Sequence, residues 1–239
     1  MRNRELLFVR KINVVLRKIL TKTHKREMDL TWNTDNKVPT FFNHFLDIYY
    51  QLFSFKKTEF LTRAIFNQLF LESNNIVLEL GCGDGFNTEV FFSPIVKEIY
   101  AIDLSEEAIS FAKINHSSKN ITYKLGDAII DYPIQKKIDR VICDAFLEQL
   151  DTLQQEELFK KISNSLSLNG ICLGSTILKG NINYLIHNKN EFTEATFNSF
   201  VANYFKYSFS INKSVDNKNY KYFALSNEPI SYFKLIKND

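Results

Sequence analysis

Closely spaced glycines mark the first segment of the chain that could do chemistry. Gly81, Gly83 and Gly85 follow directly after an apolar run at 76–80. Glycine tolerates positive φ and lets a ligand approach the backbone closely. A glycine loop alone is a weak signal, because nucleotide-binding folds of many kinds contain one. The pattern predicts a nucleotide-like cofactor and leaves its identity open.

Two acidic residues narrow the kind of cofactor. Asp103 stands 20 residues after Gly83, at the end of a second apolar segment. In a doubly wound sheet its carboxylate would lie beside the loop and accept both ribose hydroxyl hydrogens. Glu79 stands two residues before Gly81, where a dinucleotide would place its pyrophosphate. A carboxylate there repels phosphate and suits an ammonium or sulfonium group, which disfavours the alternative of an NAD-dependent oxidoreductase.

The elements that must position these residues alternate along the chain. Apolar runs at 76–80, 98–103, 121–125, 138–143 and 171–177 predict strands, and helices are expected near 86–92, 105–116 and 152–166. Strands alternating with helices indicate an α/β fold with a parallel, doubly wound Rossmann-like sheet. Segments 207–215 and 220–226 predict an antiparallel hairpin at the end.

With these motifs the chain resembles the class I S-adenosylmethionine-dependent methyltransferases of the small-molecule or saccharide type. The resemblance covers roughly residues 70–226 and rests on motif-like segments in the expected order, at 78–85, 101–105, 126–128, 138–150 and 167–171. It implies a seven-stranded sheet with an antiparallel last strand, and S-adenosyl-L-methionine as the cofactor.

The resemblance also implies roles for individual residues. The expected cofactor-binding residues are Glu79, Gly81, Cys82, Gly83, Asp103, Leu104, Asp127, Ala128 and Phe146. Backbone N–H groups of Gly81 and Gly83 are expected against the methionine part, and Asp127 and Ala128 at the adenine edge. Leu104 and Phe146 suit the adenine faces. An ordinary turn role stays open for Asp127.

A hydroxyl acceptor usually needs a general base. The catalytic candidates are His187, Asp144 and His44, with Glu191 as a further candidate base. The alternative for His187 is a structural or exposed position, because Thr193 and Thr196 could make the following segment a capping region. The alternative for Asp144 is a turn role. Gln149 stands where the family often has His, so no base is expected there.

The acceptor class follows from what the fourth-strand motif lacks. Segment 143–146 has neither proline of the motif common in nucleic-acid amino methyltransferases, and no appended RNA-binding domain is visible. A small-molecule or saccharide acceptor is therefore expected, and nucleic acid is disfavoured. An RNA or protein methyltransferase and a non-catalytic cofactor-binding protein stay open as alternatives.

The N-terminal segment differs from the rest in charge. Residues 1–27 hold nine Lys and Arg against two Glu, a net +7, so a chain total of +3 leaves −4 for residues 28–239. Apolar residues spaced at Phe8, Ile12, Val15 and Ile19 predict an amphipathic helix over 4–26. It could pack on the domain as part of a helical cap, contact an anionic membrane surface or acidic partner, or bind RNA. Residues 1–55 are expected to form this cap and 56–239 the cofactor-binding domain.

The three cysteines of the chain help to predict its cellular compartment. Cys82, Cys143 and Cys172 fit no compact zinc pattern and no disulfide framework, so no metal is expected. No apolar run approaches the length of a membrane span. A cytoplasmic protein is expected, monomeric or homodimeric, with peripheral contact at the inner membrane face left open.

Overall fold

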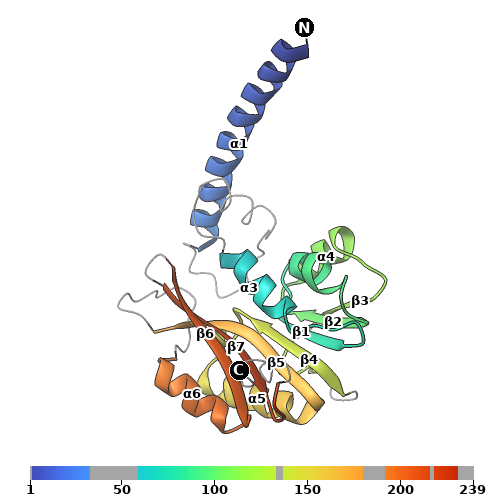
Figure 1. Ribbon diagram of the computed structural model, residues 1–239, viewed down its shortest axis with the longest axis vertical. Helices are drawn as coiled ribbons and strands as arrows, with labels where there is room; N and C mark the ends of the chain where they lie inside the picture. Colours follow the sequence, from blue (N-terminus) through green and yellow to red (C-terminus); the bar gives the residue numbers. More distant parts are fainter. Residues whose placement is uncertain (1, 33–58, 133–136, 180–191, 216–217, 231–239) are drawn as a thin grey trace, which may run out of the picture.

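A computed structural model describes residues 2–32, 59–132, 137–179, 192–215 and 218–230. Its centre is a seven-stranded sheet in the order β3-β2-β1-β4-β5-β7-β6 (Figure 1). The strands are β1 Ile76–Leu80, β2 Glu98–Asp103, β3 Ile121–Leu125, β4 Ile138–Asp144, β5 Leu166–Leu178, β6 Tyr207–Val215 and β7 Lys218–Ser226. The predicted Rossmann-like α/β sheet and its final hairpin are confirmed.

Strand pairing places the cofactor motifs at one edge of the sheet. β1 pairs in parallel with both β2 and β4, and Glu79 lies opposite Ala101 on one side and Ile142 on the other. β7 is antiparallel to both β5 and β6. The strand order reverses between β1 and β4, and ligands of such sheets bind outside the carboxyl ends of the strands at that point. The glycine loop and the end of β4 therefore meet there.

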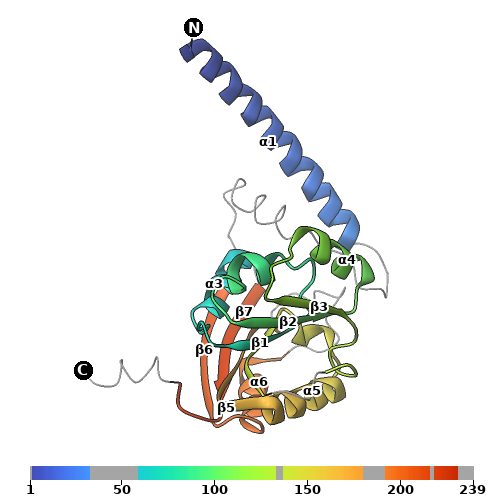
Figure 2. The same cartoon turned by 90° about the vertical axis from the view of Figure 1, so that its right-hand side faces the viewer.

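Helices cover both faces of the sheet (Figure 2). α5 (Thr152–Ser165) and α6 (Glu194–Ala202) share a buried core with Leu78 and Leu80. α3 (Glu59–Gln68), the π-helical turn η1 (Thr88–Phe92) and α4 (Glu106–Asn115) contribute to a second core, on the side of Val77. Side chains of a strand alternate between faces, so Glu79 lies on the Val77 side, beneath α3 and η1.

Side-chain caps fix where the helices begin. The Ser105 hydroxyl accepts a hydrogen bond from the Ala108 N–H at the start of α4. Thr193 and Thr196 form a reciprocal capping box at the start of α6. Such caps satisfy backbone N–H groups that have no partner inside the helix. The capping alternative for the segment after His187 is thus present in the structure.

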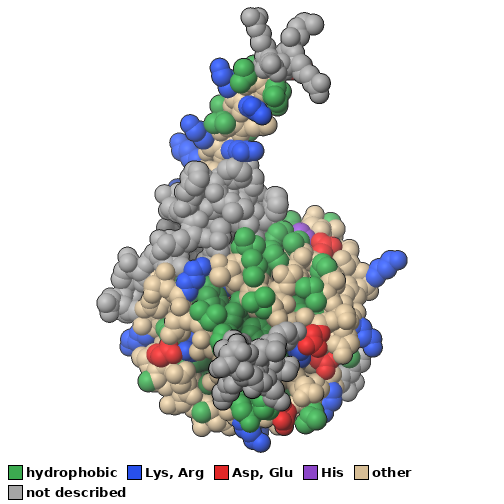
Figure 3. Space-filling view, viewed as in Figure 1, with side chains coloured by type: hydrophobic (Ala, Val, Ile, Leu, Met, Phe, Trp, Pro, Cys, Tyr) green, Lys and Arg blue, Asp and Glu red, His purple; other side chains and the backbone are tan. Residues whose placement is uncertain are grey.

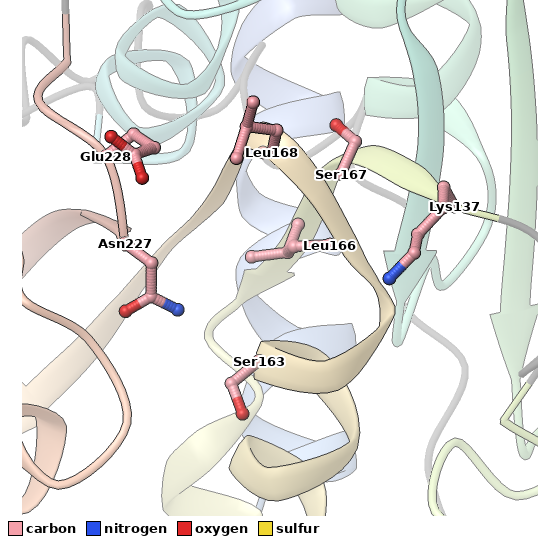
Figure 4. A pocket seen from close by; sticks show the side chains of 8 residues that line it. Lys137, Ser163, Leu166, Ser167, Leu168, Asn227 and Glu228 are labelled. Carbon is pink, nitrogen blue, oxygen red and sulfur yellow. The ribbon is translucent and has the colours of Figure 1, made fainter.

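The predicted start of the fifth strand at residue 171 is wrong. β5 begins immediately after α5, and the register with β4 shifts between the pairs Ile138–Leu166 and Arg140–Ile171. The extra residues of β5 between those pairs form a bulge that contains Gly170. A pocket of about 400 Å³ lies beside this bulge, lined by Leu166, Gly170 and their neighbours (Figure 4). It lies at the amino ends of β4 and β5, the edge opposite the glycine loop.

α1 (Arg2–Trp32) is longer than the predicted 4–26 and projects away from the sheet (Figures 1 and 2). Phe8, Ile12, Val15 and Ile19 are 64%, 40%, 55% and 55% exposed. Those side chains therefore do not pack on the domain, contrary to the first of the three alternatives for this helix. Among the described residues, no helix combines the length and apolarity needed to cross a membrane. The boundary at 55/56 lies outside the described residues and stays a prediction.

Candidate functional site

The glycine loop is tied to the second strand. The N–H groups of Gly81 and Cys82 both donate to the Ile102 carbonyl, at 2.8 and 3.1 Å. Gly81 has φ +73°, and a Cβ there would lie 2.7 Å from Cδ2 of Phe146. A side chain at Gly81 would meet both a strained backbone and the Phe146 ring. The loop conformation thus depends on glycine, and Phe146 lies against it. The expected contact of Phe146 with adenine stays a prediction.

Asp103 connects the loop to the end of β2. Its Oδ2 accepts the Gly83 N–H at 2.8 Å, and its Oδ1 accepts the Ser105 N–H at 2.9 Å. The sequence prediction that Asp103 lies beside the loop is therefore borne out in position. The expected use of the Gly81 and Gly83 N–H groups against the methionine part needs correction, because the protein's own Ile102 and Asp103 already accept from them.

Glu79 is buried, with 5% of its surface exposed. The Thr88 hydroxyl donates to Glu79 Oε2 at 2.6 Å. Burial is the main cause that raises the pKa of Glu79 to about 8. The Thr88 hydrogen bond lowers this pKa, and the negative charges of nearby carboxylates raise it further. Glu79 is therefore protonated at neutral pH in the protein alone. The carboxylate form expected from the sequence requires a cation beside it.

Several carboxyl groups surround the loop. Asp144, Asp103 and Asp84 each raise the pKa of Glu79 through their negative charge. Asp84 is fully buried inside the loop, and its Oδ1 accepts the Phe86 N–H. Burial also raises the pKa of the Cys82 thiol, so that cysteine is a neutral, buried neighbour. Negative surroundings of this kind disfavour a pyrophosphate and fit the ammonium and sulfonium charges of S-adenosylmethionine.

The end of β4 carries a buried ion pair. Arg63 Nε of α3 lies 3.5 Å from Asp144 Oδ2, with the side chains 7% and 13% exposed. The Ser175 hydroxyl donates to Asp144 Oδ1 at 2.6 Å. Both oxygens of this carboxylate therefore have partners in the protein. These contacts favour a positioning role for Asp144 over the predicted role as a base.

Glu148 is a buried carboxyl group that sequence reasoning missed. It lies in the 3₁₀ turn η2 (Leu147–Gln149), is 5% exposed, and accepts a hydrogen bond from the Thr176 hydroxyl at 3.2 Å. Burial raises its pKa to about 7, and the nearby charges of Arg63 and Asp144 act in opposite directions on it. A group with this pKa can hold or release a proton at neutral pH.

Two asparagines, one on α3 and one beside η1, have unsatisfied polar atoms. Asn67 of α3 is 1% exposed, and its amide nitrogen and oxygen have no hydrogen-bond partner among the described residues. The same holds for Oδ1 of Asn87, beside η1. Buried polar atoms without partners are rare. Asn67 follows Arg63 by one helical turn, and Asn87 directly precedes Thr88. The unsatisfied atoms on these two elements fit a site that receives a polar ligand.

Asp127, Ala128 and Leu104 are among the residues expected to contact the adenine. Asp127 Oδ1 accepts the N–H groups of Ile129 and Ile130 at 2.7 and 3.1 Å, so Asp127 has the turn role left open by the sequence. Ala128 is 8% exposed and Leu104 is 57% exposed. Contacts of all three with adenine stay predictions. His187, His44 and Glu191 lie outside the described residues, and their roles also stay predictions.

A family model described as "Methyltransferase domain" matches residues 71–224. The chain belongs to this methyltransferase family. The matched range contains the glycine loop, Asp103, Asp144 and Glu148, and S-adenosylmethionine is the cofactor of this domain. The alternative of an NAD-dependent oxidoreductase is excluded.

Curated relatives share part of the chain. Malonyl-[acyl-carrier protein] O-methyltransferase of Bacillus cereus is 32% identical over 123 residues, 51% of this chain and 45% of that protein. N-demethylindolmycin N-methyltransferase of Streptomyces griseus is 28% identical over 111 residues, 44% of this chain and 47% of that protein. The chain therefore spans about half the length of these relatives.

Solved structures agree in fold. The N-methyltransferase NodS of Bradyrhizobium japonicum, in complex with S-adenosyl-L-homocysteine, has a TM-score of 0.59 at 17% identity, covering 76% of this chain and 93% of that one. A DhpI complex with S-adenosylhomocysteine has a TM-score of 0.50 at 16% identity, covering 64% and 78%. At these identities the likeness shows the shared fold.

Proposed function

We propose that this domain transfers the methyl group of S-adenosylmethionine to a small molecule that bears a hydroxyl group, with saccharides as the leading class. The observation that carries the hydroxyl preference is Glu148, a buried carboxyl group with a pKa of about 7 beside Asp144 and Arg63. Carboxylate acceptors need no proton removed, whereas a hydroxyl acceptor loses one. The related proteins named above are O- and N-methyltransferases. They therefore support methyl transfer as the reaction but do not favour one kind of acceptor over another.

Bound S-adenosylmethionine supplies an activated methyl group, and the protein positions the partners. Glu79 would hold the ammonium group, because a nearby cation stabilises its ionised form. Asp103 would accept the ribose hydroxyls at the end of β2. Arg63 would neutralise the methionine carboxylate, since it is the buried cation of α3 that reaches the end of β4. Glu148 would take the proton from a hydroxyl acceptor.

A methyl-transfer screen tests the proposal. The full chain would be incubated with methyl-radiolabelled S-adenosylmethionine and panels of sugars and nucleotide sugars, phenols, amines, carboxylic acids, RNA and protein. We expect labelled product in a hydroxyl-bearing small-molecule panel. Label only in amines, carboxylic acids, RNA or protein would overturn the acceptor class. Cofactor binding without transfer to any panel would favour the non-catalytic alternative.

A further inference from the structure

α1 carries an exposed apolar surface that the methyltransferase domain does not use. Large hydrophobic side chains between 40% and 64% exposed occur throughout residues 6–19 of α1: Leu6, Leu7, Phe8, Val9, Ile12, Val14, Val15, Leu16 and Ile19. Figure 3 shows hydrophobic and basic side chains together on the surface of this helix. Exposing so much apolar surface to water is unfavourable and marks an interaction site.

Helical geometry sorts these side chains into faces. At 3.6 residues per turn, one arc of roughly 120° contains most of the apolar residues. Its members are Phe8, Val9, Ile12, Val15, Leu16 and Ile19. The basic residues Arg10, Lys11, Arg17, Lys18 and Lys22 fall on the other side of the helix and are exposed. Leu6, Leu7 and Val14 lie outside the apolar arc. The helix is thus amphipathic, with a cationic polar face.

A second copy of the chain is a poor occupant for the apolar arc. A coiled-coil seam through Phe8, Ile12, Val15 and Ile19 would continue at Glu5 on one side and at Lys22 and Arg26 on the other. Charged residues therefore limit the seam to about two heptads, fewer than the three to four that identify a coiled coil. Two such basic helices would also repel each other. RNA would neutralise the basic face and leave the apolar arc in water.

An anionic lipid surface satisfies both faces at once. An amphipathic helix that lies in the plane of a membrane buries its apolar face at the acyl-chain boundary, while Lys and Arg contact anionic headgroups. We propose that α1 attaches the methyltransferase domain to the surface of a membrane rich in anionic phospholipid. The proposal concerns α1 alone and does not depend on the acceptor or on catalysis.

Vesicle co-sedimentation of the full chain tests this proposal. The probes are phosphatidylcholine vesicles with and without 30% phosphatidylglycerol, and we expect binding only to the anionic vesicles, decreasing with salt. Ile12→Glu places a charge at the centre of the apolar arc. Asn13→Glu is its matched control, because the exposed Asn13 lies outside that arc and the change in charge is the same.

We expect Ile12→Glu to weaken vesicle binding by more than about 30-fold, through lost apolar burial and charge insertion, and Asn13→Glu by about 5-fold, through charge alone. Both variants should retain the helicity and cofactor affinity of the unchanged protein. Equal effects of the two substitutions would overturn insertion of the apolar arc. Equal sedimentation with neutral and anionic vesicles would overturn the preference for anionic phospholipid. Concentration-dependent dimerisation or RNA binding, without vesicle binding, would overturn attachment to a membrane.

Discussion

The Thr88 hydroxyl donates a hydrogen bond to Glu79 Oε2 at 2.6 Å, inside the protein and beside the glycine loop. Glu79 has a pKa of about 8 in the folded chain, against 4.5 as the ordinary value. The folded state therefore binds a proton that the unfolded state releases between about pH 4.5 and 8. By linkage, the free energy of unfolding decreases as pH rises through this window.

Glu79→Gln should remove that contribution to the pH dependence. The amide of the variant stays neutral throughout this range. From pH 5 to pH 8, its free energy of unfolding should therefore rise by roughly 2–4 kcal/mol relative to that of the unchanged protein. Urea unfolding at the two pH values measures this difference. Glu148 titrates in the same direction in both proteins, so the comparison isolates Glu79. Parallel stability curves would show that Glu79 is already ionised in the folded protein.

Cofactor binding should release a proton from Glu79. The ammonium group of S-adenosylmethionine stabilises the carboxylate, so affinity should rise with pH between about pH 6 and 8. Calorimetric titration in two buffers of different ionisation enthalpy would count the protons released. Glu79→Gln should abolish most of this release. A titration heat that is independent of the buffer would contradict the assignment of Glu79 to the ammonium group.

Gly81→Ala should lower the free energy of unfolding by about 1–3 kcal/mol, since alanine is strained at positive φ. Its Cβ would also meet Phe146 Cδ2 at 2.7 Å. A double-mutant cycle with Phe146→Ala separates the two causes. The loss should shrink in the Phe146→Ala background without disappearing. An unchanged loss there would mean that Phe146 adjusts freely and that φ alone accounts for the effect.

Glu148→Gln should reduce kcat toward a hydroxyl acceptor by about 100-fold or more, as expected for removal of a general base. It should also abolish the rise of activity through about pH 7. Glu156→Gln, an exposed position on α5, is the matched control and should leave the pH profile unchanged. A Glu148→Gln variant with an unaltered pH profile would show that Glu148 has only a structural role.

The sequence was sufficient for the fold because parallel strands buried on both faces give continuous apolar runs. The runs around Val77 and Ile142 show this, as does the position of Asp103 at the end of β2. The bulge in β5 was missed because nothing in the sequence near Gly170 distinguishes a turn from extra residues within a strand.

The site was predicted less completely than the fold. Arg63 meets Asp144 only through the packing of α3 on the sheet, which no local pattern encodes. Glu148 lies within the fourth-strand motif, but its raised pKa depends on burial, which the local sequence does not show. The hydrogen bonds of the Gly81 and Gly83 N–H groups to β2 depend on tertiary register, so the sequence alone predicts a free loop that could bind a ligand.

We propose that the glycine loop and Asp103 bind S-adenosylmethionine. Calorimetric titration of the full chain with S-adenosylhomocysteine tests it most directly, in the unchanged protein, Asp103→Ala and the exposed control Glu106→Ala. We predict binding at one site, weakened by about 1.5–3 kcal/mol in Asp103→Ala through loss of charged hydrogen bonds and unchanged in Glu106→Ala. No binding by the unchanged protein at millimolar cofactor, or equal affinity in Asp103→Ala, would contradict the claim.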